Sequence, residues 1–319
     1  MTRISPILSV STARASAPGL FLAVLVAGIC LRVPEFASAR SFLAVLSDAA
    51  PLALLAAGLT FVILIGAIDL SVQSVASLSS VIAALLVPRF GPIGFLAAIA
   101  GGLAAGLFSG LTYVTLRVPS FIATLASSGV VTGVALYISN AATVTIDERS
   151  RVYFDWINGS ILGVPGYIIV TAAILAICAI VQNYTPFGRY SLAIGSGEAA
   201  AWAAGVRVGR QKVYALVVSG LLAAIVGVIL AGRQLSGSPT LANELLLPSI
   251  AAVLVGGTAI TGGVGGIGRT LIGALIVSVL RIGMTFLGIN IFAQQIVFGA
   301  FLILAVGLTI DPEKLPFVK

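Results

Sequence analysis

One acidic side chain lies within a long apolar region of this 319-residue chain. Asp69 stands in the segment GAIDLSV at residues 66–72, between two apolar runs. A carboxylate at membrane depth is costly, so such a residue is a candidate for a transport pathway or a gate. The carboxylate can also cap a helix by accepting from backbone N–H groups two or three residues on, and capping is the commoner role. Both roles are compatible where a helix is broken beside a cavity.

Further polar side chains within apolar runs are weaker candidates for a pathway. Ser and Thr in such runs usually bond to their own helix or to a neighbouring helix. Adjacent Gln294 and Gln295 cannot share a helix face, so at most one of them faces a given pathway. With Asp69, the pathway candidates are Ser71, Gln73, Thr124, Asn140 and Gln294.

The sequence lacks the residues that several kinds of catalysis and nucleotide binding require. The chain has no His, and its two cysteines, Cys30 and Cys178, lie within apolar runs. No lysine follows a glycine-rich turn, so the chain has no P-loop for ATP. The segment 263–268 matches G-x-G-x-x-G, but no acid follows about 20 residues later to hold a ribose. Close packing or a tight turn is the better interpretation of these glycines.

The composition is that of a membrane protein. Hydrophobic residues make up 59% of the chain and charged residues 8%, against about 25% charged residues in soluble domains. The mean hydropathy is +1.17. The net charge of +7 comes from scattered Lys and Arg with no basic run, which does not fit a nucleic-acid partner. These values exclude a soluble enzyme and a disordered chain.

We expect an all-α polytopic membrane protein with about ten transmembrane helices, because each apolar run approaches the 20 residues that cross a bilayer. The runs are 17–33, 49–68, 70–87, 93–116, 121–142, 164–181, 213–231, 245–261, 270–287 and 291–310. A proline, glycine and threonine pattern at 51–66 is similar to one at 248–263. It suggests two inverted five-helix halves, as in transporters with inverted repeats.

The distribution of Lys and Arg gives an orientation. With about ten spans and a cytoplasmic N-terminus, the short loops carry more of these residues inside than outside. Residues 1–319 then form a single transmembrane domain, with short cytoplasmic tails at 1–16 and 311–319. A hydrophilic loop at 141–165 falls outside, and a longer one at 182–212 falls inside.

The loop at 182–212 has about thirty residues, although a connection between two spans needs only a handful. Pro186, Gly188, Gly195 and Gly197 interrupt its backbone. The alanine-rich segment that follows, residues 198–204, favours a helix, and Gly205 is placed to end it. The sequence therefore predicts a short cytoplasmic helix between glycines.

Several motifs together resemble the ribose/xylose/arabinose-type permease family of bacterial ABC importers. They are GLTFVI at 58–63, GAIDLSV at 66–72, VPSFIATL at 118–125, FGR at 187–189, AIG at 193–195, EAA at 198–200, GV at 205–206, SIAAVLVGGT at 249–258 and GGVG at 262–265. The likeness runs in order from about residue 36 to residue 308. Ala67 and Gln73 replace glycines of the family pattern, and residues 244–250 also depart from it, which leaves the particular sugar open.

The resemblance implies a single permease domain of about ten helices in the bacterial inner membrane, with both termini cytoplasmic. It implies as partners a second permease copy or a paralogue, a cytoplasmic ATPase with two nucleotide domains, and a periplasmic sugar-binding protein. ATP and Mg would be bound by the ATPase, so no cofactor is expected in this chain. The residues expected to couple to the ATPase are Gly195, Glu198, Ala199, Ala200, Trp202 and Gly205.

Other functions stay open at this stage. Permeases for nucleosides or branched-chain amino acids share the layout, and an ion-coupled secondary transporter would also be polytopic. The latter class usually needs intramembrane carboxylates, and Asp69 alone, without a His, is a poor proton relay. An ATPase and a sugar-binding protein encoded beside this chain would identify the importer.

Overall fold

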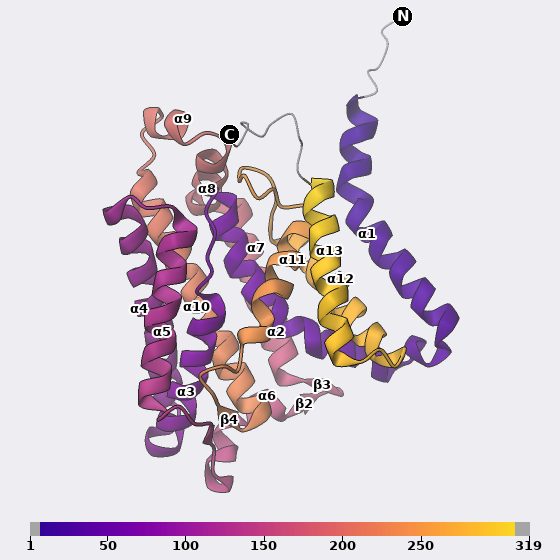
Figure 1. The fold of residues 1–319 in the computed structure, drawn as a ribbon, viewed down its shortest axis with the longest axis vertical. Coiled ribbons are helices and arrows are strands. Elements are labelled where there is room, and N and C mark those ends of the chain that lie inside the picture. The colour runs from indigo at the N-terminus through magenta and orange to yellow at the C-terminus, as the bar shows by residue number, and fades with distance from the viewer. Residues whose placement is uncertain (1–6, 310–319) are drawn as a thin grey trace, which may run out of the picture.

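The computed structural model describes residues 7–309 as a bundle of helices (Figure 1). The first six residues of the predicted tail 1–16, and the whole of the tail 311–319, lie outside these described residues. The long helices are α1 Ile7–Arg32, α2 Ala39–Leu64, α3 Val72–Phe90, α4 Ile93–Leu116, α5 Ser120–Ile138, α7 Gly166–Tyr184, α10 Val208–Gln234, α12 Ile267–Phe286 and α13 Ile291–Thr309. The shorter ones are α6 Asp155–Asn158, α8 Pro186–Ser196, α9 Glu198–Ala203 and α11 Leu246–Val255, with 3-10 turns at Pro34–Ala37, Glu148–Phe154 and Asn243–Leu245.

Two short antiparallel strand pairs lie at one end of the bundle. β1 (Val144–Thr145) pairs with β4 (Ser236–Gly237), and β2 (Ser160–Ile161) pairs with β3 (Val164–Pro165). Figure 1 shows these strands at the opposite end from α9. We call the two ends of the molecule the α9 end and the strand end.

Seven helices of the described chain are long and apolar enough to cross a membrane: α2, α3, α4, α5, α7, α10 and α12. Three more helices have shorter apolar stretches, at Ala17–Arg32, Asn243–Val255 and Phe292–Phe301. The all-α polytopic class is therefore confirmed, whereas the count of about ten spans stays a prediction.

The predicted continuous helix over 245–261 is wrong. α11 ends at Val255, and residues 256–266 are not helical. Gly257 follows the C-cap with a φ angle of +91°, a left-handed conformation that favours glycine and ends the helix, and Gly262 and Gly263 further along have φ angles of +87° and +75°. The structure therefore has a second non-helical segment, in addition to the one around Asp69.

The second helix also begins earlier than its apolar run. α2 starts at Ala39 instead of 49, because Ser38 is its N-cap and accepts from the backbone N–H of Ser41 at 3.2 Å. From residue 49 to its end this helix is buried on all sides. α10, α12, α11 and α7 surround it.

The packing of α4 against α10 depends on small residues. Gly102 and Gly106 are one helical turn apart on α4 and face Gly220 of α10, where an added Cβ at any of the three would overlap the opposite backbone or side chain. Such close approach lets two helices associate without bulky side chains. It keeps α10, which follows the loop predicted at 182–212, fixed against the bundle.

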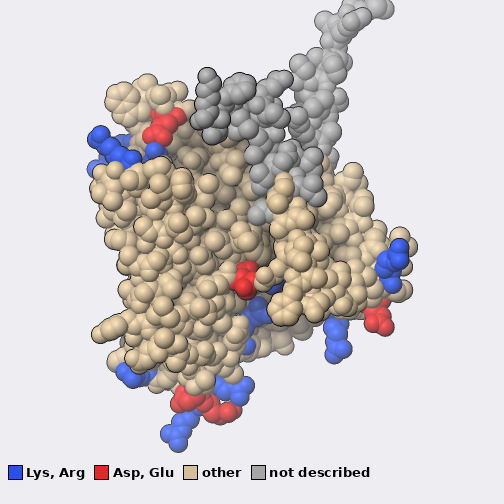
Figure 2. Space-filling model, viewed as in Figure 1, with Lys and Arg blue, Asp and Glu red and all other residues tan. Residues whose placement is uncertain are grey.

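Charged side chains gather at the two ends of the molecule, and the surface between them is mostly uncharged (Figure 2). This is the distribution expected of a bundle that spans a bilayer. α1 lies at the edge, where it packs on α12 through Ile29 and Val279. Phe36, just after α1, meets Phe286 edge to face, with ring centroids 5.5 Å apart.

Candidate functional site

The loop between α7 and α10 contains the short helix that the sequence predicts. Pro186 begins α8, and the six residues of α9 follow after Gly197. Gly205, with φ +84°, closes α9 by donating to the carbonyl of Trp202 at 2.9 Å, and Val206 N–H donates to Ala201 O at 3.0 Å. The glycine is required there because a left-handed residue ends the helix.

Helix α9 has one buried side and one exposed side. Ala201 is buried against Ile194 and Val208, which anchors the helix to α8 and α10. Trp202 is 73% exposed, and Ala199 and Ala200 are exposed beside it. A large aromatic side chain on an exposed helix is typical of a protein contact.

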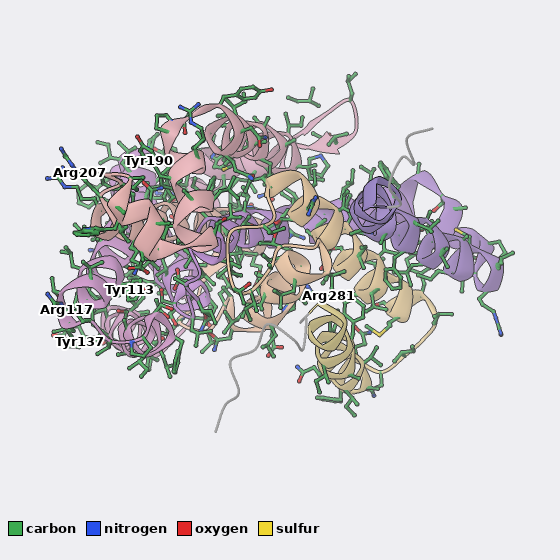
Figure 3. All side chains as sticks on the ribbon, turned by 90° about the horizontal axis from the view of Figure 1, so that it is seen from above. Tyr113, Arg117, Tyr137, Tyr190, Arg207 and Arg281 are labelled. Carbon is green, nitrogen blue, oxygen red and sulfur yellow. The ribbon has the colours of Figure 1, made fainter. Side chains whose placement is uncertain are left out.

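A polar cluster ties the base of α9 to the rest of the bundle. Lys212 of α10 forms an ion pair with Glu198 at 2.8 Å and lies over the ring of Tyr113, 5.1 Å from its centroid. Viewed from the α9 end, Figure 3 shows Tyr113 and Arg117 on the same side of the molecule as Tyr190 and Arg207. Glu198 therefore fixes the position of α9, because its carboxylate is engaged within the chain.

The end of α8 touches both non-helical segments. Gly195 packs so closely on them that an added Cβ would overlap the Leu64 carbonyl oxygen and the Gly263 amide nitrogen. Gly263 N–H donates to Leu64 O at 3.0 Å, and Gly262 lies against Gly66. We call this contact of Leu64, Gly66, Gly195, Gly262 and Gly263 the glycine junction. It joins the loop that carries α9 to the segment that carries Asp69.

Asp69 is buried, 2% exposed, and has three short hydrogen bonds. One carboxylate oxygen accepts from the backbone N–H and the hydroxyl of Ser71, at 2.8 and 2.6 Å, and the other accepts from the Ser219 hydroxyl of α10 at 2.7 Å. The bond to the N–H two residues on is the one that the sequence predicts for a capping Asp. The bond to Ser219 also holds the start of α3 against α10.

Two side chains of α5 bond to the backbone of the same segment. Ser120 Oγ accepts from Ile68 N–H at 3.0 Å, and Thr124 Oγ1 accepts from Leu70 N–H at 3.0 Å. Non-helical backbone at membrane depth requires such partners. Thr124, a predicted pathway residue, is thus buried and bonds to the Asp69 segment.

The other predicted pathway residues lie apart from one another. Gln73 is half-buried in the first turn of α3, and its side-chain oxygen is buried without a hydrogen-bond partner. Asn140 is exposed in the turn after α5, with φ +52°, so it lies outside the helix predicted over 121–142. Gln294 lies on α13, where its amide donates to Ile289 O at 3.1 Å. The structure brings together Asp69, Ser71 and Thr124 only.

Sequence reasoning missed residues that complete these contacts. Ser219 is an ordinary serine in apolar surroundings, and no local pattern marks it, whereas Ser120 lies in the motif at 118–125 without being singled out as a site residue. Gln182, at the start of the predicted loop, accepts from Ile267 N–H at 2.7 Å and donates to Gly265 O at 3.3 Å, so it holds the beginning of α12. Its partners lie more than 80 residues away along the chain.

The polar side chains described above bond to backbone and to one another. Within residues 7–309, no group of three or more His, Cys, Asp and Glu side chains could hold a metal ion. The polar groups instead bond within the two non-helical segments, around Asp69 and at 256–266, and within the loop that carries α8 and α9. Broken helices within a bundle are the usual place for a transport pathway.

Comparison with known families identifies the class. A family model described as "Branched-chain amino acid transport system / permease component" matches residues 41–306. The chain belongs to this family of permease components. The matched range includes the Asp69 segment, the α8–α9 loop and the glycine junction.

Individual relatives carry more specific names. The chain is 37% identical over 294 residues to the ribose import permease protein RbsC of Bacillus subtilis, which covers 91% of this chain and 90% of the relative. It is 37% identical over 287 residues to the probable ABC transporter permease protein YphD of Escherichia coli, covering 89% and 86%. The L-arabinose ABC transporter permease protein AraH of Azospirillum brasilense is 34% identical over 285 residues, with 89% and 84% covered.

Proposed function

We propose that this chain is the transmembrane permease subunit of an ABC importer that carries a monosaccharide into the cytoplasm by alternating access. The observation that carries the proposal is the 37% identity with a ribose import permease along about nine-tenths of both chains. An arabinose permease matches over a similar length. The cargo is therefore a sugar, of pentose size.

The alternative cargoes are branched-chain amino acids and nucleosides. The description of the matching family names the first of these. The named relatives favour sugars, because the ribose and arabinose permeases match along nearly the whole chain. An ion-coupled secondary transporter is the less favoured alternative, since the one deeply buried carboxylate of the described chain, Asp69, is fully occupied by serine hydrogen bonds.

The proposed assembly contains two permeases, as a second copy or a paralogue, a cytoplasmic ATPase with two nucleotide domains, and a periplasmic sugar-binding protein. ATP and Mg are bound by the ATPase, and this permease itself carries no cofactor. Both termini lie in the cytoplasm, about ten helices span the inner membrane, and the two halves form an inverted repeat. The exposed side of α9 supports a docking role for Ala199, Ala200 and Trp202.

We further propose distinct roles within the chain. Glu198 positions α9 and Gly205 ends it. Gly195 transmits a displacement of α9 to the Asp69 segment through the glycine junction. Asp69, Ser71 and Thr124 hold that segment beside the pathway. Gln73 and Gln294 line the pathway, and Asn140 borders it at the strand end.

Uptake into proteoliposomes tests the proposal. The permease is reconstituted with its ATPase, and liganded binding protein is added on one side with radiolabelled ribose, arabinose, leucine or uridine. We expect ATP-dependent uptake of a pentose and none of the others. Uptake of leucine or uridine alone, or uptake driven by an ion gradient without ATP, would refute the assignment.

A further inference from the structure

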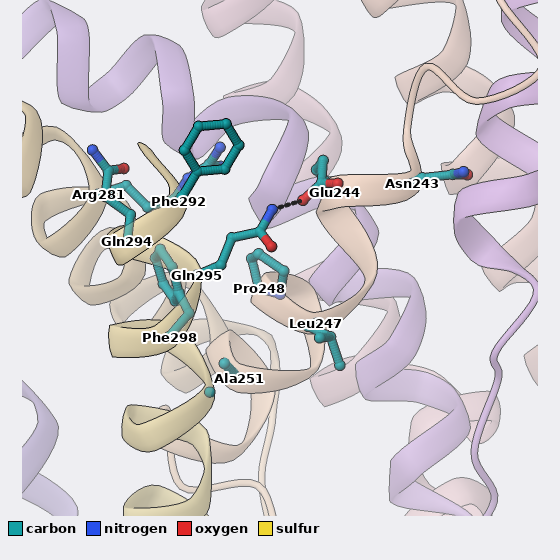
Figure 4. Close-up of a pocket in the computed structure, with 11 residues that line it drawn as sticks. Asn243, Glu244, Leu247, Pro248, Ala251, Arg281, Phe292, Gln294, Gln295 and Phe298 are labelled. Carbon is teal, nitrogen blue, oxygen red and sulfur yellow. Dashed lines mark hydrogen bonds between the residues drawn. The ribbon is translucent and has the colours of Figure 1, made fainter. Parts of the chain in front are cut away.

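A cavity of about 440 Å³ opens on the face formed by α11, α12 and α13 (Figure 4). This volume falls in the range of about 300–1,000 Å³ that is common for small-molecule sites. Its lining is mixed in chemistry. The polar lining residues are Asn243, Glu244, Arg281, Gln294 and Gln295, and the apolar ones include Phe292 and Phe298.

Both Gln294 and Gln295 line the cavity. The cavity lies beside the first turns of α13, and the segment 243–251 lines its other side. The amide of Gln294 bends back to Ile289 O at 3.1 Å. The amide of Gln295 points across the cavity and donates to Glu244 Oε2 at 3.0 Å, as Figure 4 shows.

The segment that carries Glu244 lies at the depth of the middle of α3. Ala242 N–H donates to Ser77 Oγ at 3.0 Å, and Ser238 N–H donates to Ser80 Oγ at 3.2 Å. Both serines are buried within the 19-residue helix α3, which is a candidate membrane span. Glu244 therefore lies inside the bundle's length.

An exposed carboxylate at this depth excludes a face covered by lipid, because a charged group in hydrocarbon is costly. Glu244 and Gln295 are both exposed in the single chain. The cavity therefore belongs to a surface in contact with water, as the lining of a transport pathway must be.

The charges of the lining favour a neutral ligand. Arg281 is already paired with Asp48 of α2 at 3.2 Å, so its charge is not free for an anion. Glu244 is the one carboxylate of the cavity lining, and a dehydrated cation needs more oxygen ligands than this. Carboxylate and amide groups bond to hydroxyls as acceptors and donors, and the rings of Phe292 and Phe298 offer flat apolar faces.

We propose that this cavity is a transient binding site for the monosaccharide within the permease, with Glu244 and Gln295 as its hydroxyl-binding pair. The inference rests on the proposed function, since it names where the imported sugar is held during its passage. The pair exchanges its mutual hydrogen bond for bonds to sugar hydroxyls. Such an exchange costs little, so the sugar is held loosely enough to leave.

Two kinds of substitution test the site. Glu244→Leu combined with Gln295→Leu removes the polar pair without leaving either partner unsatisfied. Gly299→Phe fills the cavity, and it is tolerated sterically because no atom lies within 4 Å of a Cβ at Gly299. The matched controls are Glu148→Leu with Gln234→Leu at the strand end, and Gly19→Phe on the open face of α1.

The assay measures sugar uptake and binding-protein-stimulated ATP hydrolysis with the same proteoliposomes of the full assembly. We expect both cavity variants to lower uptake about tenfold, since the site would lose its polar contacts or its space. Stimulated hydrolysis should stay within about twofold of the unaltered importer, because the α9 contact is unchanged. The control variants should resemble the unaltered importer in both measurements.

Three outcomes would overturn the site. One is uptake by both cavity variants that equals uptake by the controls. Another is an equal loss of uptake and hydrolysis, which would indicate a structural role. The third is dissociation of the assembly, which would make the cavity a contact between permease copies. If the unaltered importer takes up no monosaccharide, the proposed function fails instead, so the two failures are distinguishable.

Discussion

The change Gly195→Ala tests whether the glycine junction transmits motion from α9. It adds one methyl group at the end of α8, where the chain meets two other backbones. A Cβ there would overlap the Leu64 carbonyl oxygen and the Gly263 amide nitrogen, and would lie 2.9 Å from the Gly262 carbonyl carbon. Backbone atoms cannot rotate away as a flexible side chain can, so α8 must move off both segments.

The size of the effect follows from two opposing terms. Overpacking a tight contact costs about 1–3 kcal/mol, whereas Ala in place of Gly gains up to about 1 kcal/mol in a helix. Gly28→Ala is the matched control, because Gly28 is also helical but has no atom within 4 Å of an added Cβ. The two variants should therefore differ in stability by about 1–3 kcal/mol, which a bundle of this size tolerates.

The functional effect should appear in a chain that still folds and assembles. We expect Gly195→Ala to keep its ATPase partner during purification but to lower uptake about tenfold, the equivalent of about 1.4 kcal/mol in the transport barrier. Thermal unfolding in detergent, co-purification and proteoliposome uptake measure the three quantities. Gly28→Ala should match the unaltered chain in uptake.

Uptake by Gly195→Ala equal to that of Gly28→Ala would refute a role of the glycine junction in transport, since the contact could then be disturbed without an effect on uptake. Loss of ATPase co-purification with Gly195→Ala would also contradict it. That result would place Gly195 in the docking surface, as the sequence alone suggests.

The remaining predictions concern Asp69, α9 and orientation. Asp69→Ala should lower uptake about tenfold with normal accumulation in the membrane, because the Ser71 and Ser219 hydroxyls lose their acceptor; a variant that fails to accumulate would make Asp69 structural only. Trp202→Ala should weaken co-purification of the ATPase, whereas Trp156→Ala, 40% exposed at the strand end, should not; equal retention would remove α9 from the docking surface. Reporters fused at the C-terminus and at Asp147 should lie on opposite sides of the membrane, and the same side for both would overturn the orientation.

Apolar runs predicted much of the bundle, because a bilayer requires helices of a fixed length. The helix predicted over 93–116 matches α4 at both ends. Apolar runs did not predict helix ends correctly where a helix continues past its apolar run, or where the backbone leaves the helix within one. α2 gains ten residues from the stretch 39–48, which Arg40 and Asp48 separate from the apolar run, and 245–261 reads as one apolar run although left-handed Gly257 ends α11.

The candidate site was predictable only where its signal is local. The glycines and alanines of 195–205 mark a short helix by their own propensities, and Asp69 stands out as an isolated charge. Their partners do not stand out, since Ser219 lies 150 residues from Asp69 and Gln295 lies 51 residues from Glu244. Such contacts are set by how the helices pack, and one sequence does not contain that information.

The glycine junction also explains why a loop outside the bundle can act on a segment within it. Side chains at a contact can change rotamer and absorb a small displacement, whereas two backbones in contact move together. The Gly263 N–H bond to Leu64 O joins the two non-helical segments, and Gly195 of α8 rests on both. A displacement of α8 is therefore expected to shift the end of α2 and the non-helical segment at 256–266 together. Contact alone does not establish coupling between two sites, and this is why the comparison of Gly195→Ala with Gly28→Ala measures uptake rather than structure.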